Sequence, residues 1–145
     1  MAARDDGRKR VFLSYSHVDD RWRDRFLVHA KSWDLDVWAD PYIRVGQDWH
    51  REIGDALDAA DVGVCLVSVD FLASDYIREH ELKPIRDRED ITAFPIPVRS
   101  AQAYERHGLG ALQWPQPPDK PLDSLRPADR RDRTLGELVK QLAEL

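Results

Sequence analysis

Apolar and polar residues follow one another along the chain in blocks that predict alternating strands and helices. Short, mainly apolar segments at residues 11–15, 35–39, 62–69 and 91–98 are typical of strands. The segment 62–69 is apolar on both faces, as expected of a central parallel strand that helices cover on each side. Pro95 and Pro97 remove backbone donors from the last segment and weaken its second half. This alternation predicts an α/β fold with a parallel sheet.

Between these segments, apolar residues recur at steps of three and four, which predicts amphipathic helices. Asp19 or Asp20 is the expected N-cap of the first helix, Asp48 of the second and Ser74 of the third. Pro84 is expected to bend or end the third helix. The apolar stripe of the first helix consists of Trp22, Phe26, Ala30 and Trp33, and its three aromatic residues are expected in the core. The stripe of the second helix consists of Trp49, Ile53, Ala56, Leu57 and Ala60.

The region of residues 95–127 is rich in proline and is expected to be irregular. A short helix near Tyr104 and a short strand near Leu112 are the regular elements expected there. The chain then closes with a helix for which Thr134 and Glu137 have the spacing of a capping box. Its apolar stripe consists of Leu135, Leu138, Leu142 and Leu145.

Composition limits the classes of function. The 145 residues suit one domain, expected at residues 10–145 after a short tail at residues 1–9. The longest apolar run, residues 62–67, is too short to span a membrane, and no secretory leader is recognisable. A net charge of −5 argues against binding nucleic acid through its phosphates. Cys65 has no partner for a disulfide and is expected to be buried and inert, which favours the cytoplasm.

Several chemistries lack their motifs. The five histidines form no helical metal pair, so no metal site is expected. The sequence also lacks a phosphate-binding Gly-Lys loop and a nucleophile elbow around a serine. In parallel α/β sheets, ligands bind at the carboxyl ends of the strands. The segments expected there are residues 14–20, 40–49 and 68–81.

Three ordered motifs in these segments resemble a known family. Residues 11–19 (VFLSYSHVD) resemble the first signature of Toll/interleukin-1 receptor (TIR) domains, especially bacterial ones. Residues 36–40 with 43–49 resemble the second strand and the long BB loop of that family. Residues 64–68, 71–77 and 81–82 resemble the third strand and the helix after it. The resemblance covers about residues 10–98, and it implies a flavodoxin-like fold with a five-stranded parallel sheet flanked by helices.

The resemblance implies an activity and a site. Many TIR domains cleave NAD⁺ between nicotinamide and ribose, and a glutamate on the helix after the third strand is essential to them. That role falls on Glu81, with NAD⁺ as substrate and no cofactor. A carboxylate there would stabilise the positive charge that develops on the ribose, and it would help to deprotonate an attacking water. Either ADP-ribose or a cyclic ADP-ribose would result.

One spacing departs from the family. An aromatic residue typically stands four positions before the glutamate, whereas Tyr76 stands five before Glu81, about 140° away around an ideal helix. Ile77 takes the four-residue spacing. Either Tyr76 lies in a non-helical cap, or its stacking role is weakened. Counting four from Tyr76 reaches His80, so the neighbouring Glu79 remains an alternative catalytic carboxylate.

Two further groups of residues are candidates for binding. Those expected to contact the nucleotide at the strand ends are Ser14, Tyr15, Ser16, Asp40, Ser74 and Tyr76. Those expected to join neighbouring TIR domains through the BB loop are Tyr42, Ile43, Arg44, Val45, Gly46 and Trp49. Ser74 and Trp49 also have structural interpretations, as a helix cap and as a packing anchor. The expected partners are other TIR domains and a fused or separate sensor, in antiphage signalling.

Two alternatives remain. A non-enzymatic adaptor would use the same BB loop only to recruit other TIR domains. A phosphoacceptor receiver domain shares the flavodoxin-like fold and would use Asp70 with Asp19 and Asp20, but this acidic pair lies several residues past the strand end, beyond where magnesium is held.

Overall fold

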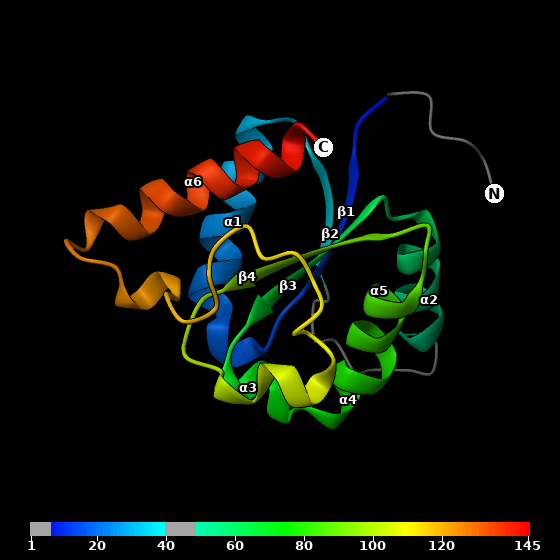
Figure 1. Ribbon diagram of the computed structural model, residues 1–145. Coiled ribbons are helices and arrows are strands. Elements are labelled where there is room, and N and C mark those ends of the chain that lie inside the picture. The colour runs from blue at the N-terminus through cyan, green and yellow to red at the C-terminus, as the bar shows by residue number, and fades with distance from the viewer. Residues whose placement is uncertain (1–6, 40–48) are drawn as a thin grey trace.

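A computed structural model describes residues 7–39 and 49–145 of the chain. Strands and helices alternate in it as the sequence predicts (Figure 1). The strands are β1 (Arg10–Ser14), β2 (Asp36–Ala39), β3 (Val62–Val67) and β4 (Thr92–Pro97). The helices are α1 (Asp20–Ser32), α2 (Trp49–Ala59), α3 (Val69–Ala73), α4 (Asp75–Ile77), α5 (Lys83–Asp87) and α6 (Asp129–Ala143). Shorter helical turns are η1 (His17–Asp19), η3 (Gln102–His107) and η4 (Leu122–Ser124), and η2 (Arg78–Leu82) is a π-helix.

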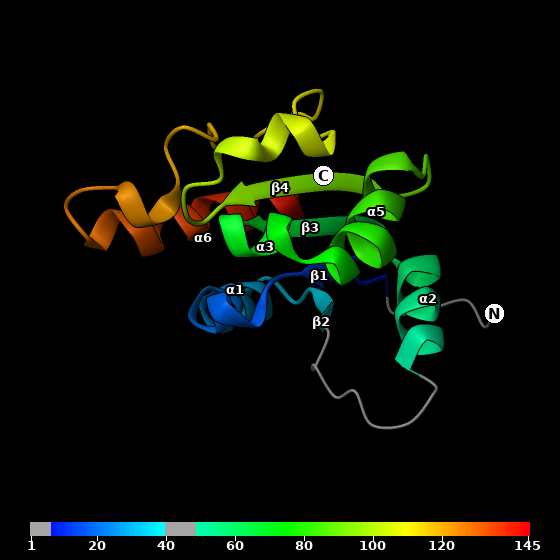
Figure 2. The same ribbon diagram turned by 90° about the horizontal axis from the view of Figure 1, so that it is seen from below.

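The strands form a parallel sheet in the order β2-β1-β3-β4 (Figure 2). The predicted α/β fold is therefore confirmed, with four strands in the described part of the chain where five were expected. The strand expected near Leu112 is replaced by turns. Pro115, Pro117 and Pro118 follow at once and have no N–H to donate, so a strand cannot continue through them.

Strand β4 contains Pro95 and Pro97 without losing its pairing with β3. It pairs with β3 alone among the described strands, and the N–H of Val98 donates to the carbonyl of Val67. N–H groups point alternately to the two sides of a strand, so those at even positions of β4 face β3. Pro95 and Pro97 occupy odd positions, and the donors they lack would face the open edge.

Helices cover both faces of the sheet. Alternate residues of each strand belong to two separate cores, because side chains of a strand point to opposite faces. Helices α1 and α6 pack on one face and α2, α3 and α5 on the other (Figures 1 and 2). Trp22 and Phe26 are buried as expected. Cys65 is buried too, and its burial raises the pKa of the thiol.

Helix ends differ from the sequence prediction at three places. Helix α1 ends at Ser32, so Trp33 leaves the apolar stripe and is 43% exposed. Helix α6 begins at Asp129, and Thr134 therefore lies inside it and cannot be the cap of a capping box. The same helix ends at Ala143, which leaves Leu145 exposed. Within the described residues, no helix is long and apolar enough to cross a membrane.

Candidate functional site

The order of the strands creates a topological switch point between β1 and β3. From β1 the chain crosses to β2 on one side, and then to β3 on the other side of β1. In α/β sheets, ligands bind outside the carboxyl ends of the strands at such a switch point. Ser14 is the last residue of β1 and pairs in register with Cys65 of β3. The candidate site is built around these two strand ends.

Glu81 points to this switch point from the helix above it. Its side chain is 1% exposed, and the hydroxyl of Ser14 donates a hydrogen bond of 2.6 Å to its Oε1 atom. The negative charge of Glu81 also contributes to the raised pKa of the Cys65 thiol, after burial. A carboxylate is almost never fully buried without a partner, and the hydroxyl of Ser14 is a partner that holds Glu81 in this inward orientation.

The helix that carries Glu81 is widened at that residue. Lys83 donates its N–H to the carbonyl of Arg78, five residues back, as in a π-helix. Pro84 explains the widening, since it has no N–H and its ring would clash with the carbonyl of His80 in a regular α-helix. Pro84 therefore neither ends nor visibly breaks the helix, which continues as α5 to Asp87.

The π-helix also changes the angle between Tyr76 and Glu81. One extra residue in the turn makes a five-residue step rotate about as far as a four-residue step does in an α-helix. The offset of about 140° expected for an ideal helix is thereby reduced. Tyr76 lies within α4 and not in a non-helical cap, so that interpretation is wrong.

The same helix packs very closely on β3. A Cβ atom at Gly63 would lie 2.7 Å from Cγ1 of Ile85 and 2.8 Å from its Cγ2. Glycine is thus required for this approach, since ordinary carbon contacts are about 3.5–4.0 Å. The close packing of α5 on the strand holds the preceding turn, and with it Glu81, near the end of β1.

Glu79 occupies a different environment from Glu81. It is exposed and lines a cavity on the outside of the helix together with Arg78 and Lys83. The structure thus places Glu81, and not Glu79, at the switch point. Which of the two takes part in catalysis remains a prediction.

Four rings form a cluster beside the site. Tyr76 lies 4.6 Å from Trp49 and 4.4 Å from His80 between ring centroids. Trp49 stacks on His50 at 4.0 Å, and the rings of His50 and His80 lie 5.1 Å apart. Trp49 is the first residue of α2 and directly follows residues 40–48. The Tyr76 ring is therefore in contact with the rings of Trp49 and His80 in this structure.

The serines and Tyr15 have structural roles that were partly expected. Ser74 caps α4 by accepting a hydrogen bond from the N–H of Ile77, as predicted. Ser16 caps η1 through the N–H of Val18. Tyr15 is 1% exposed, belongs to the core beside α1, and accepts a hydrogen bond from Arg23 through its hydroxyl oxygen. Contact of these residues with a nucleotide stays a prediction, and Tyr15 has no exposed surface for it here.

Several predicted residues lie outside the described part of the chain. These are Asp40 and the BB-loop residues Tyr42, Ile43, Arg44, Val45 and Gly46, together with the expected cap Asp48.

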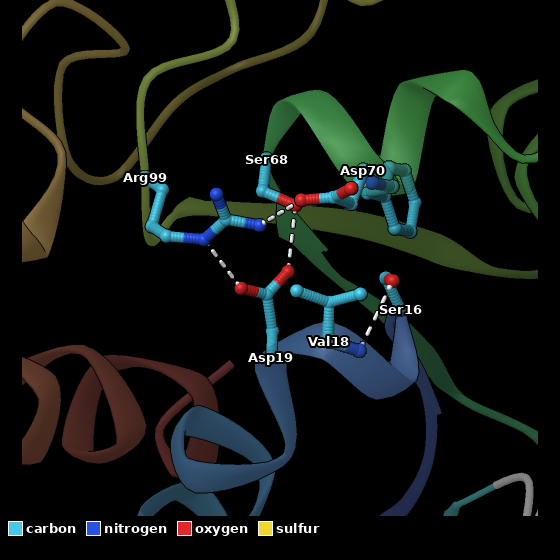
Figure 3. A network of polar contacts seen from close by, with 7 residues as sticks. Ser16, Val18, Asp19, Ser68, Asp70 and Arg99 are labelled. Carbon is cyan, nitrogen blue, oxygen red and sulfur yellow. Dashed lines mark hydrogen bonds and ion pairs between the residues drawn. The ribbon is translucent and has the colours of Figure 1, made fainter.

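A polar network at the same edge of the sheet was missed by the sequence analysis. The hydroxyl of Ser68 donates to Asp19 at 2.6 Å, and Arg99 donates to Asp19 at 2.6 Å and to Asp70 at 2.5 Å (Figure 3). Asp19 is 1% exposed, and instead of capping α1 with its side chain it accepts both bonds. Ser68 also caps α3 through the N–H of Phe71, which ends β3 at Val67.

This network joins three strand ends. Asp19 follows β1, Ser68 and Asp70 follow β3, and Arg99 follows β4. The signal in the sequence was a polar residue within five positions after each of these strands. Arg99 would have been found by asking what neutralises Asp19 and Asp70. Two of the three carboxylates that the receiver-domain alternative would use, Asp19 and Asp70, are thus paired with the guanidinium of Arg99. Among the described residues, no cluster of three or more His, Cys, Asp or Glu side chains is arranged to hold a metal ion.

Comparison with known proteins identifies a family to which the sequence is similar. Residues 11–134 match the sequence family described as TIR domain. The chain is also similar to an uncharacterised protein, y4lF, of Sinorhizobium fredii, with 32% identity over 122 residues. The aligned region covers 72% of this chain and 38% of that protein, so the chain spans less than half of the relative's length.

Proposed function

The chain belongs to the TIR domain family, and we propose that it is an NAD⁺ glycohydrolase with Glu81 as its catalytic carboxylate. The observation that carries the proposal is the inward-facing Glu81 at the carboxyl ends of β1 and β3, held by Ser14. Ligands of α/β folds bind at the topological switch point, and a buried titratable group at that point is a candidate for catalysis.

One carboxylate suffices for the proposed reaction. The bond between the nicotinamide nitrogen and the ribose carbon breaks, and its electron pair returns to the nicotinamide ring, which leaves uncharged. The ribose becomes positively charged in the transition state, and a nearby carboxylate stabilises it electrostatically. Water then adds to the carbon and loses a proton to Glu81, which gives ADP-ribose. Attack by another group of the same molecule would give a cyclic ADP-ribose instead.

The surrounding residues would position the substrate. In the proposal, Ser14 orients the carboxylate. Ser16 and Ser74 contact the ribose or phosphates, and Asp40 contacts the ribose. Tyr76 would stack on the nicotinamide, which requires that the contacts of its ring with Trp49 and His80 be exchanged for contacts with substrate. NAD⁺ is the substrate in this scheme and no further cofactor takes part.

Burial of Glu81 supports a requirement for assembly. A carboxylate that is 1% exposed cannot contact a substrate without rearrangement of its surroundings. We propose that contacts between TIR domains through the BB loop and Trp49 supply this rearrangement. The setting would be immune signalling against phage in a bacterial cytoplasm, with a sensor on the same or a separate chain.

Mass spectrometry of NAD⁺ incubated with the protein tests the proposal. The protein is used both in dilute solution and clustered on a multivalent scaffold, with Glu81→Ala and Glu79→Ala as matched variants. We expect nicotinamide to appear with the clustered wild type and Glu79→Ala, and to be lost with Glu81→Ala. Cleavage that survives in clustered Glu81→Ala would contradict the proposal.

A non-enzymatic scaffold is the second candidate, and the same burial of Glu81 favours it, because a sealed carboxylate is also compatible with a purely structural role. Absence of nicotinamide from every clustered sample, with assembly intact by light scattering, would establish this alternative.

A further inference from the structure

A cavity of about 620 Å³ lies outside the helix that carries Glu81. It is lined by α4, η2 and α5 on one side and by the end of η3 on the other, with Arg106 and His107 contributed by η3. Glu81 itself is not among its lining residues. The volume falls in the range of sites for small molecules, about 300–1,000 Å³.

The cavity is cationic although the chain as a whole is anionic. Among its lining residues, Arg78, Lys83, Arg86 and Arg106 are cationic and Asp75 and Glu79 are anionic, which gives an excess of two positive charges. Asp87, beside the cavity, pairs with Arg86. The net charge of the whole chain is −5. The charge of the cavity lining is therefore opposite in sign to that of the chain.

Several of these cations lack acceptors in the described part of the chain. The side chains of Lys83 and Arg106 form no hydrogen bond or ion pair with residues 7–39 and 49–145. The Nε atom of Arg78 is buried and has no hydrogen-bond partner there, while its Nη2 atom bonds Asp75. Buried donors normally have partners, and a ligand oxygen in the cavity would supply one to Nε of Arg78. The side chains of Lys83 and Arg106 are exposed and free to bind the same ligand.

The position of Arg86 is fixed in advance by the turn opposite. Its Nη1 atom donates to the carbonyl of His107 at 3.0 Å. Gly108 has a φ of 78°, and a Cβ atom there would lie 2.7 Å from Nη1 of Arg86. Glycine thus leaves the space that the guanidinium occupies, and the guanidinium is held at the cavity wall.

We infer that this cavity binds a small molecule that carries a phosphate or diphosphate group. Guanidinium groups fit phosphate oxygens in bidentate geometry, and a Lys ammonium adds a point charge. The inference does not depend on cleavage of NAD⁺, because it concerns a separate cavity and is tested by binding.

His107 makes binding dependent on pH. Burial lowers the pKa of His107, and the charges of Arg78 and Arg106 lower it further. The other charged groups around the cavity are Asp75, Glu79, Lys83 and Arg86. An anion beside the imidazole favours its protonated form, so bound phosphate raises the pKa of His107. By linkage, the imidazole makes the anion bind more tightly as the pH falls from the raised pKa of His107 in the complex towards its pKa in the free protein.

Isothermal titration with inorganic pyrophosphate and with ADP tests the site. The test protein is a double variant that carries Lys83→Ala and Arg106→Ala. The control is a double variant that carries Arg130→Ala and Lys140→Ala, which removes the same charge from α6. We expect Kd to rise at least about tenfold in the first variant, and less than about twofold in the second. Tighter binding of ADP than of pyrophosphate would identify a nucleotide as the ligand, and equal binding a free phosphate.

The result that overturns the inference is binding of neither probe to the wild type, or an equal loss in both double variants. NMR of the imidazole provides an independent readout. The pKa of His107 is expected to rise when pyrophosphate is added, and an unchanged pKa at saturation would also contradict the inference.

Discussion

Removal of Arg99 tests the network that joins the three strand ends. In Arg99→Met, the buried carboxylate of Asp19 loses its cation and, of its side-chain donors in the described part of the chain, keeps the hydroxyl of Ser68. Removal of one partner from a buried ion pair costs about 3–5 kcal/mol. Because the Arg99 side chain is 25% exposed, we expect the low end, about 3 kcal/mol. For a chain of this length, that corresponds to a fall in Tm of roughly 10 °C.

Asp70→Asn is the matched control in the same network. Asp70 binds the same guanidinium, but its side chain is 41% exposed, so its loss is expected to cost about 0–1 kcal/mol. The double variant Asp19→Asn with Arg99→Met removes the stranded charge, and is expected to recover more than about 1 kcal/mol. Urea unfolding followed by circular dichroism measures all of these. Equal losses of stability in Arg99→Met and Asp70→Asn would refute the reasoning.

Three further predictions concern packing and titration. Gly63→Ala should lower the free energy of unfolding, measured by calorimetry, by about 1–3 kcal/mol. Ile85→Ala should then lower the free energy of unfolding less in the Gly63→Ala protein than in the wild type, because it removes the clash. Asp132→Asn should lower the free energy of unfolding by a few tenths of a kcal/mol at pH 7, because Arg25 and then His29 lower the pKa of Asp132. This difference in stability should vanish as the pH falls below 3.8, and a difference that persists at pH 2 would contradict the prediction. Iodoacetamide should modify Cys65 only on unfolding, because burial raises the pKa of its thiol.

The layers of the fold were predictable because the buried face of each strand and helix requires apolar residues at regular intervals in the sequence. The strand at residues 62–67 is apolar on both faces because both faces are covered. Trp22 and Phe26 fall on one stripe for a similar reason. Trp33 continues the spacing but lies past the last helical residue, and periodicity alone does not reveal where a helix ends.

The candidate site was predictable only in part. Ser14 and Glu81 follow from matching motifs, but their hydrogen bond joins residues 67 positions apart and depends on the tertiary fold. The π-helix was missed because Pro84 was expected to bend or end a regular helix, whereas the turn before it widens. The role of Asp19 was missed for another reason, since a tertiary partner, Arg99, competes with the local cap.

Comparison of Glu81→Gln with Glu79→Gln in clustered protein tests the central claim most directly. The glutamine side chain keeps the size of the carboxylate and can still accept the hydrogen bond of Ser14, so loss of charge is separated from loss of packing. The rate of nicotinamide release, measured together with Tm, is expected to fall at least about 100-fold in Glu81→Gln and to change less than about twofold in Glu79→Gln. A Glu81→Gln protein that folds and still releases nicotinamide at the wild-type rate would contradict the account.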